Sequence, residues 1–360
     1  MASPPSKTVP LTVRCHCEKV SLNVEIPQER FPLESSICHC RSCRHATGQI
    51  FTTFANIPTD IPSELLQDDH NNLTTYRSSS TLLRLFCKSC GASIANFDSA
   101  YQDEWGLATG CIKFAGDPLG HEGRLNRIQI WLDDVRSDGG AAVWINAGTS
   151  VGMDRHWRGR GSGTVSDSDV QDILTGDSSA QESEQAREAP SLGRNNTLDG
   201  RCHCGTISFT VSQPDEQHNH GTGKFEASLD ACTSCRLVTG FEITSWATVP
   251  QDLIKTTASS FNAYLADRSK LNHYKSSQDV SRYFCTKCGA TIFYQNHGLA
   301  TIDIAIGILD PSSNEQARAE DWLLWQKYPK AISYPEDAVD RKLVQGLADG
   351  LRLHMGELKG

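Results

Sequence analysis

The chain has 360 residues, of which 38% are hydrophobic and 21% are charged, and its mean hydropathy is −0.40. This length and composition favour two globular domains and exclude a single small module, a membrane protein and a wholly disordered chain. The net charge of −9 argues against a nucleic-acid partner, because proteins that bind nucleic acid do so largely through clustered cations.

The start of the chain lacks the apolar run of a signal peptide, and no later stretch is apolar enough to span a membrane. We therefore expect a cytoplasmic or nuclear protein with no membrane partner. In that reducing setting the 14 cysteines are expected to bind metal or to do chemistry rather than to form disulfides.

The cysteines recur in the same order in both halves of the chain. The first half carries a Cys-x-Cys pair, a Cys-x-Cys-x2-Cys cluster and a Cys-x2-Cys-Gly turn, at Cys15 and Cys17, at Cys38, Cys40 and Cys43, and at Cys87 and Cys90. The second half carries the matching groups Cys202 and Cys204, then Asp230, Cys232 and Cys235, then Cys285 and Cys288. The stretch 43–48 also aligns without a gap to 235–240, so we predict a tandem duplication.

Composition places the boundaries between the two copies. We predict one domain over 1–157 and a second over 201–360. The segment 158–200 is rich in Gly, Ser, Asp and Glu and almost free of aromatic residues. Such a segment cannot bury enough apolar surface to offset its ordering entropy, so it predicts a flexible acidic linker.

Within each copy the pattern is mainly that of strands. Residues 20–24 and 207–211 alternate apolar and polar side chains with a period of two, and 51–55 and 243–247 are β-branched and aromatic runs. The fold class is therefore mainly β. Near the end of the chain, a helical packing face is predicted from the spacing of Val339, Leu343, Leu347 and Leu351.

Two sets of four cysteines have the spacing of closed zinc sites. Thiolates that lie two or three residues apart on tight turns can reach one ion together, and zinc prefers four tetrahedral ligands. We therefore predict two structural zinc sites, one formed by Cys15, Cys17, Cys87 and Cys90 and the other by Cys202, Cys204, Cys285 and Cys288.

The middle cluster of the first copy offers only three thiolates, from Cys38, Cys40 and Cys43. A fourth zinc position would be left to water or substrate, which is the arrangement of a catalytic zinc. The alternative is three reduced cysteines in a turn. His39 and His16 lie inside Cys-x-Cys pairs, where strand alternation points them away from the metal of their neighbours.

These motifs together resemble the family of glutathione-dependent formaldehyde-activating enzymes, which also includes centromere protein V. The likeness covers most of both halves and omits the linker and the tails. In that family the fold is a mainly β "tent", the outer four cysteines hold a structural zinc, and the middle three hold a catalytic zinc near which glutathione binds. The resemblance implies two tandem zinc-binding β-tent domains joined by a disordered acidic linker.

The resemblance also implies an activity, a zinc-dependent carbon–sulfur lyase that acts on a small thiol adduct such as S-hydroxymethylglutathione. Cys38, Cys40 and Cys43 would form its reactive site. Three alternatives are open: a zinc-stabilised module that binds protein or chromatin, a metabolite-tailoring enzyme that does not use glutathione, and a second copy that serves only to complete the pocket of the first.

The second copy departs from the pattern at Asp230, which stands where the first middle cysteine belongs. Three interpretations follow. Asp230, Cys232 and Cys235 hold an altered catalytic zinc, or the cluster binds no second metal, or Asp230 acts as a general base.

Some further residues are candidates for the site. Arg44 directly follows Cys43, and we place it in the catalytic set, where it would pair with an anionic substrate or lower a thiolate pKa. The alternative is that Arg44 and its counterpart Arg236 brace the turn. His45 is an acid–base candidate. Cys111 aligns with an apolar residue and is predicted to be a core thiol, and Tyr76 and Tyr274 occupy matched positions.

Overall fold

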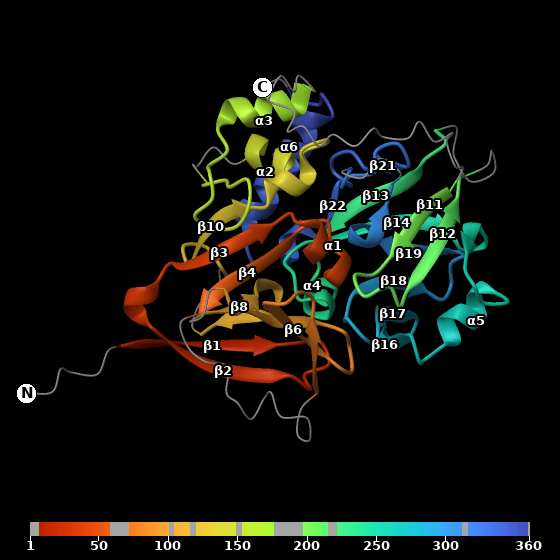
Figure 1. Cartoon of the computed structure of the whole chain (residues 1–360), viewed down its shortest axis with the longest axis horizontal. Helices are drawn as coiled ribbons and strands as arrows, with labels where there is room; N and C mark the ends of the chain where they lie inside the picture. Colours follow the sequence, from red (N-terminus) through yellow and green to blue (C-terminus); the bar gives the residue numbers. More distant parts are fainter. Residues whose placement is uncertain are drawn as a thin grey trace, which may run out of the picture.

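The computed structural model describes residues 7–57, 72–100, 104–115, 120–148, 153–175, 197–214, 222–311 and 316–358. Each half of the chain builds one small sheet and one large sheet (Figure 1). We call the half before residue 176 the first copy and the half after residue 196 the second copy. The prediction of a mainly β chain with two similar halves is confirmed.

In the first copy the small sheet has the strand order β2-β1-β9 and the large sheet the order β10-β3-β4-β8-β7-β6-β5. Neighbouring strands are antiparallel except for β10 and β3, which are parallel. The bounds are β1 (Thr8–Arg14), β2 (Ser21–Pro27), β3 (Leu33–Cys38), β4 (Thr52–Ile57), β5 (Leu73–Arg77), β6 (Leu82–Cys87), β7 (Ser93–Asp98), β8 (Trp105–Ala108), β9 (Ile112–Phe114) and β10 (Leu125–Ile130).

The second copy repeats this plan, with a small sheet β15-β12-β11-β20 and a large sheet β16-β17-β18-β19-β14-β13-β21. Strands β21 and β22 pair parallel with β13, as β10 does with β3. The bounds are β11 (Thr197–Arg201), β12 (Ser208–Ser212), β13 (Phe225–Asp230), β14 (Thr244–Pro250), β15 (Ile254–Lys255), β16 (Leu271–Ser277), β17 (Val280–Cys285), β18 (Thr291–Asn296), β19 (Thr301–Ala305), β20 (Leu309–Asp310), β21 (Leu323–Trp325) and β22 (Ile332–Ser333).

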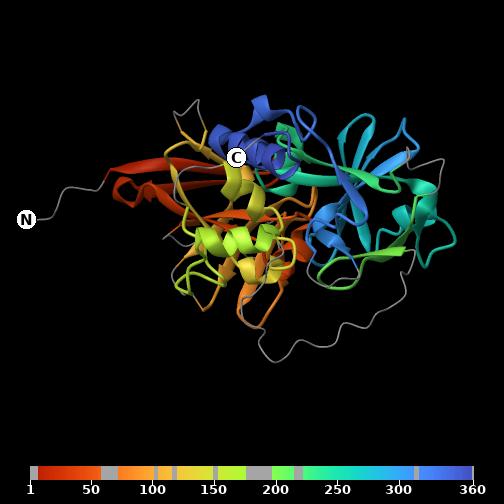
Figure 2. The same ribbon diagram turned by 90° about the horizontal axis from the view of Figure 1, so that it is seen from above.

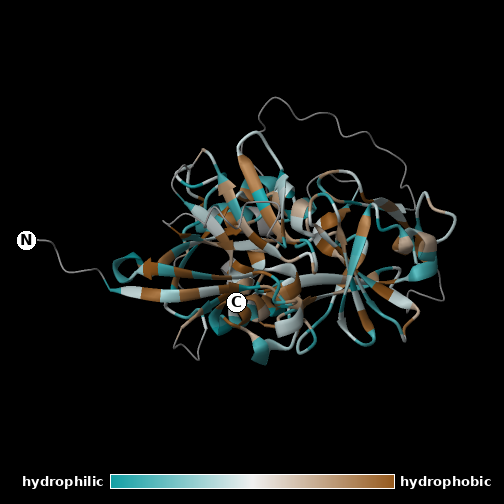
Figure 3. Ribbon diagram, turned by 90° about the horizontal axis from the view of Figure 1, so that it is seen from below, coloured by the Kyte–Doolittle hydropathy of each residue, from teal (hydrophilic) through white to brown (hydrophobic). Residues whose placement is uncertain are grey.

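Side-chain alternation explains how the small sheets are placed. In β2 the side chains are alternately exposed and buried, which is the period-two pattern of a strand with one face on the core. Figure 3 shows this alternation as teal and brown bands along the strands. The apolar face is thereby fixed toward the interior, because a one-residue slip would turn it to solvent.

The described helices range from 6 to 14 residues in length. Their bounds are α1 (Arg41–Thr47), α2 (Ala142–Gly148), α3 (Asp167–Thr175), α4 (Thr233–Thr239), α5 (Phe261–Ala266) and α6 (Arg341–His354). The predicted terminal packing face is confirmed for Leu343, Leu347 and Leu351, which are buried along α6, but Val339 lies before the helix begins. Helix α6 of the second copy packs on α2 of the first (Figure 2).

The two copies share one extensive interface whose contacts come in reciprocal pairs. The amide of Gly110 donates to Gly240 O, and the matching amide of Gly307 donates to Gly48 O, each at 2.9 Å. Such an interface is isologous, like that of a twofold homodimer. The hydrophobic core of the second copy also includes Ile50, Phe51 and Trp144 of the first, whereas the strands of the first copy enclose a further core of their own.

The range predicted for the linker, 158–200, includes residues at both ends that belong to the folded copies. Residues 167–175 form α3, and Val165 and Val170 pack against Leu132 and Ala142 of the first copy. At the other end, β11 begins at Thr197 and belongs to the small sheet of the second copy. Residues 176–196, on which the rest of the prediction falls, lie outside the described residues. No helix in the described ranges has the length and apolar character needed to cross a bilayer.

Candidate metal centres and reactive site

The middle cysteines of the first copy converge where β3 meets α1. Cys38 is the last residue of β3, and Cys40 is the N-cap of α1, where its Sγ accepts a hydrogen bond from the amide of Cys43 at 3.2 Å. The Sγ atoms of Cys38 and Cys43 are 3.6 Å apart, and all three sulfur atoms lie within 4.8 Å of one another. The predicted cluster is therefore brought together, and its three side chains are buried.

Arg84, which the sequence analysis missed, completes this cluster. It extends from β6, is 6% exposed, and donates from Nη2 to the Sγ of Cys43 at 3.2 Å. Hydrogen bonds from the thiols of Cys38 and Cys40, together with the Arg84 cation, hold the pKa of Cys43 well below its usual range. A recognisable signal was present, because Arg84 and Arg282 occupy the same position before the third cysteine group in both copies.

A cavity of about 390 Å³ lies over this cluster. This volume is within the range of small-molecule sites, about 300–1,000 Å³. Besides the three cysteines and Arg84, its wall combines aromatic and amide side chains, among them Phe54, Asn56, Asn96 and Trp131. The arrangement can therefore present three sulfur donors to a small polar molecule that enters from the cavity.

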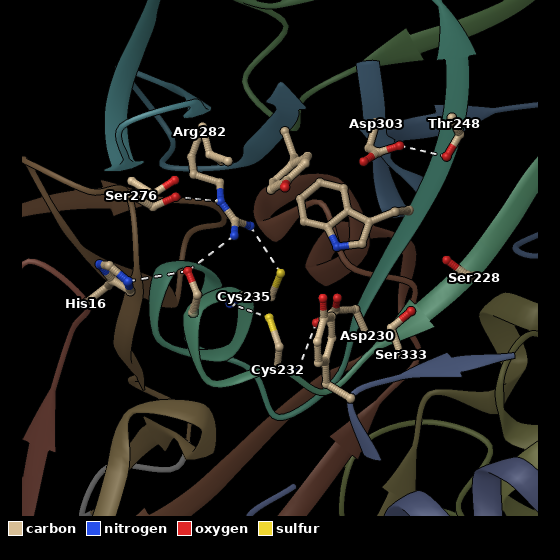
Figure 4. A pocket seen from close by; sticks show the side chains of 16 residues that line it. His16, Ser228, Asp230, Cys232, Cys235, Thr248, Ser276, Arg282, Asp303 and Ser333 are labelled. Atoms are coloured by element: carbon tan, nitrogen blue, oxygen red, sulfur yellow. Dashed lines mark hydrogen bonds between the residues drawn. The ribbon is translucent and has the colours of Figure 1, made fainter. Parts of the chain in front are cut away.

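The second copy builds the corresponding site with Asp230 in the first position. One carboxylate oxygen of Asp230 accepts from the amide of Cys232 at 2.8 Å, and Arg282 donates from Nη1 to the Sγ of Cys235 at 3.2 Å (Figure 4). The ligand atoms of Asp230, Cys232 and Cys235 also lie within 4.8 Å of one another. A cavity of about 490 Å³ opens over them. The substitution therefore changes the donor set but leaves the site accessible.

The predicted four-cysteine sites are both assembled. The Sγ atoms of Cys15 and Cys17 are 3.5 Å apart, and those of Cys17 and Cys87 are 3.6 Å apart. The matching distances in the second copy, from Cys204 to Cys202 and to Cys285, are 3.5 and 3.6 Å. A tetrahedral zinc with bonds of about 2.3 Å needs sulfur atoms about 3.8 Å apart, so the residues fit this metal.

Arg44 and His45 lie away from the cavity. Arg44 is 4% exposed and is not among the described residues that line the cavity. Its counterpart Arg236 donates to Gly110 O across the interface at 2.5 Å, which favours bracing of the turn over catalysis for this pair. The ring of His45 bonds through Nδ1 to Arg201 O, and burial lowers the pKa of His45 to about 4.

Three further residues from the sequence analysis, Cys111, His39 and His16, lie outside the cysteine clusters. Cys111 is 2% exposed and packs in the core of the first copy, as predicted. His39 turns away from the cysteines and bonds through Nε2 to Gln129 at 3.0 Å. His16 likewise turns away from its own four-cysteine site and reaches the second copy, where it lines the cavity over Asp230.

Comparison with known proteins places the chain in a family. The model of the glutathione-dependent formaldehyde-activating enzyme family matches residues 10–133 and 197–325, which together are more than half of the chain. The chain therefore belongs to this family and contains two copies of its domain.

One curated relative is a protein of Schizosaccharomyces pombe described as an uncharacterized lyase. It is 32% identical over 80 residues, which is 22% of this chain and 52% of that protein. The match thus spans about half the length of the relative.

Proposed function

We propose that the protein is a zinc-dependent carbon–sulfur lyase that acts on a small thiol adduct such as S-hydroxymethylglutathione at the cavity of the first copy. The observation that carries this proposal is the buried set of Cys38, Cys40 and Cys43 beneath a small-molecule cavity. Family membership and the lyase description of the yeast relative support the reaction class.

The first copy has the residues for this chemistry. Cys38, Cys40 and Cys43 would hold a zinc ion, which in a site with one open position acts as a Lewis acid and lowers the pKa of a bound thiol. Arg84 offsets the negative charge of the thiolates through its bond to Cys43. Asn56 and Asn96 offer amide groups to the polar part of a substrate.

The reaction itself needs no oxidant or reductant. The carbon–sulfur bond of the hydroxymethyl adduct breaks, its electron pair goes to sulfur, and the hydroxyl loses its proton as the carbonyl of formaldehyde forms. The thiolate product takes up a proton. The reverse sequence joins thiol and aldehyde.

The two four-cysteine sites would hold structural zinc, and Asp230, Cys232 and Cys235 would hold a weaker, altered site. Elemental analysis of the purified protein tests this assignment. A content of four zinc ions per chain would mean that both middle clusters are occupied, three that one is, and two that only the four-cysteine sites are filled. The last result would overturn a zinc-dependent reaction at Cys38, Cys40 and Cys43.

Activity is tested with S-hydroxymethylglutathione, by following the release of formaldehyde. Cys40→Ser is expected to abolish turnover while the protein keeps its fold by circular dichroism. Cys111→Ser, which alters a buried thiol outside every predicted site, is the matched control and should retain turnover. Unchanged turnover in Cys40→Ser would exclude the proposed reactive site.

A further inference from the structure

Each copy presents a histidine from its Cys-x-Cys pair to the helix that carries the middle cysteines of the other copy, α1 or α4. His203 lies between Cys202 and Cys204 in the second copy, and its amide donates to His45 O at the end of α1 in the first copy. The matching amide of His16 donates to Leu237 O at the end of α4. The rings of both histidines therefore project across the interface.

Both ring nitrogens of His203 are engaged by the first copy. Nδ1 lies 2.7 Å from the hydroxyl of Tyr76, and Nε2 lies 3.1 Å from the hydroxyl of Ser42. Ser42 is in the first turn of α1, between Cys40 and Cys43, and it lines the cavity of the first copy. With a partner on each nitrogen, the ring has a fixed orientation and restrains the Ser42 hydroxyl.

The second copy repeats this arrangement with the roles exchanged. His16 Nδ1 lies 2.8 Å from the hydroxyl of Tyr274. His16 Nε2 lies 3.3 Å from the hydroxyl of Ser234, the contact drawn from His16 in Figure 4. Ser234 in turn accepts from Arg282 Nη2 at 3.3 Å, and Arg282 bonds Cys235. The geometry occurs twice although the copies differ at Asp230 and Leu237, so it is not an accident of one loop.

We propose that the reactive site of the first copy is composite, and that His203 of the second copy is its positioning residue, acting through Ser42. This inference rests on the proposed function of that site. The restrained hydroxyl of Ser42 would face the cavity beside Cys40 and Cys43 and hydrogen-bond the oxygen of a hydroxymethyl adduct. His203 itself would not touch the substrate.

The second copy thereby has a role that does not depend on its own middle cluster. The replacement of a cysteine by Asp230 leaves Cys202 and Cys204 in place, and these residues flank His203. A second copy with altered chemistry would therefore still be needed for turnover in the first.

Two substitutions of His203 separate its contacts. In His203→Gln the side-chain amide can reach the position of Nε2 and keep the bond to Ser42, whereas in His203→Asn it can reach only the position of Nδ1. We expect His203→Asn to lower kcat by about 10- to 100-fold, with a smaller effect on KM. Losses of this size are typical when a residue that orients the groups around a metal is replaced. His203→Gln should retain most of the turnover.

A double-mutant cycle distinguishes positioning from a general structural effect. Ser42→Ala should lower kcat, and adding His203→Asn to Ser42→Ala should cause little further loss, because both changes remove the same interaction. Additive losses would overturn the proposal, and so would a His203→Asn protein that turns over normally. His297→Asn, in which a histidine of the second copy loses its bond to Ser281, is the control and should leave turnover unchanged.

A second readout works even if S-hydroxymethylglutathione is not a substrate. Iodoacetamide labelling of Cys40 and Cys43 in the full-length protein, followed by mass spectrometry, reports how firmly the first turn of α1 is held. We expect His203→Asn and Ser42→Ala to speed labelling about threefold or more, and His203→Gln to leave it unchanged. Equal labelling rates in all four proteins would overturn the positioning role, whereas absent turnover with altered labelling would overturn only the proposed reaction.

Discussion

A buried arginine lies beside the last cysteine of each middle cluster. Arg84 and Arg282 each donate to the last cysteine of a middle cluster, at 3.2 Å in both copies. Three thiolates around a divalent zinc ion leave one negative charge uncompensated, and burial makes such a charge costly. The arginine offsets that charge and is therefore expected to strengthen metal binding.

Replacement of Arg84 by methionine keeps the bulk of the side chain and removes its charge. We expect Arg84→Met to weaken zinc binding at Cys38, Cys40 and Cys43 by about 10- to 100-fold, because the thiolates lose their compensating partner. Competition against a chromogenic chelator measures this change. Arg282→Met is the matched control, since Arg282 contacts the second middle cluster and its loss should leave zinc affinity at the first unchanged. Arg84→Met protein with the zinc affinity of the wild type would contradict the expectation.

The residues of the site differ in how far the sequence could predict them. The cysteine groups were predictable because each lies on a local turn whose spacing suits zinc, and the duplication supplied every group twice. The contact of Arg84 with Cys43 joins positions 41 residues apart, and that of His203 with Ser42 joins positions 161 apart. No local pattern encodes such pairings, because they depend on how the sheets and the copies dock.

At the scale of elements, the packing of α6 on α2 depends on Gly350, a residue type that by itself disfavours a helix. A Cβ atom at Gly350 would lie 1.7 Å from the carbonyl oxygen of Trp144, so the two backbones meet where a side chain would stand. Helix propensity disfavours glycine by about 1 kcal/mol relative to alanine. The close approach of α2 is the physical reason that this cost is tolerated.

Gly350→Ala is therefore expected to destabilise the protein, although the same change stabilises an isolated helix. Overpacking of this kind lowers the free energy of unfolding by about 1–3 kcal/mol. Urea unfolding followed by tryptophan fluorescence provides the measurement. Gly298→Ala, whose added Cβ would be 3.6 Å from its nearest neighbour, is the control and should have little effect. A stabilised Gly350→Ala protein would show that α2 and α6 do not meet this closely.

Buried charges also tie elements of the two copies together. Arg127 of β10 donates from Nη2 to both oxygens of Glu242, at 2.7 and 2.8 Å, and from Nε to Asp340 at 3.0 Å. Asp340 is the N-cap of α6. Although burial opposes ionisation, the Arg127 guanidinium and the His121 ring hold the pKa of Glu242 well below its usual range.

This depressed pKa predicts acid sensitivity. The contribution of Glu242 to stability is complete above the ordinary carboxyl pKa of about 4.3 and is lost as the pH falls below it, since the unfolded chain then binds the proton more readily. We expect Glu242→Gln to cost roughly 3–5 kcal/mol at neutral pH and to show a weaker further loss on acidification. Urea unfolding of the wild type and of Glu242→Gln across a pH series tests both points. Both proteins contain the same cysteine sites, so any pH effect of those sites is common to both.

A surface pair provides the comparison for Glu242. Glu18 bonds Arg14 at 2.9 Å, but the two side chains are 65% and 49% exposed. Glu18→Gln should therefore change the free energy of unfolding by no more than about 1 kcal/mol. If Glu242→Gln behaved like Glu18→Gln, the buried cluster would not connect the two copies as its geometry indicates.

At the scale of the whole molecule, the duplicated chain resembles a homodimer whose subunits have been joined. The copies exchange backbone hydrogen bonds in reciprocal pairs, residues of the first copy join the core of the second, and α2 packs against α6. Each copy also places a histidine against the helix that carries the middle cysteines of the other. The covalent connection is therefore one of several features that hold the copies together, and the noncovalent interface has the apolar character of an obligate one.

We expect the two copies to remain associated when the polypeptide between them is cut. A protease recognition site inserted between residues 176 and 196 allows the purified protein to be cleaved under native conditions. We expect both fragments to elute as one particle of the original size in gel filtration and to separate only in denaturant, because separation would expose Phe51, Trp144 and the apolar face of α6. Separate elution of two folded fragments would contradict this expectation. The cleaved complex should also keep the turnover of the uncut protein, since His203 reaches Ser42 across the interface and not through the connecting segment.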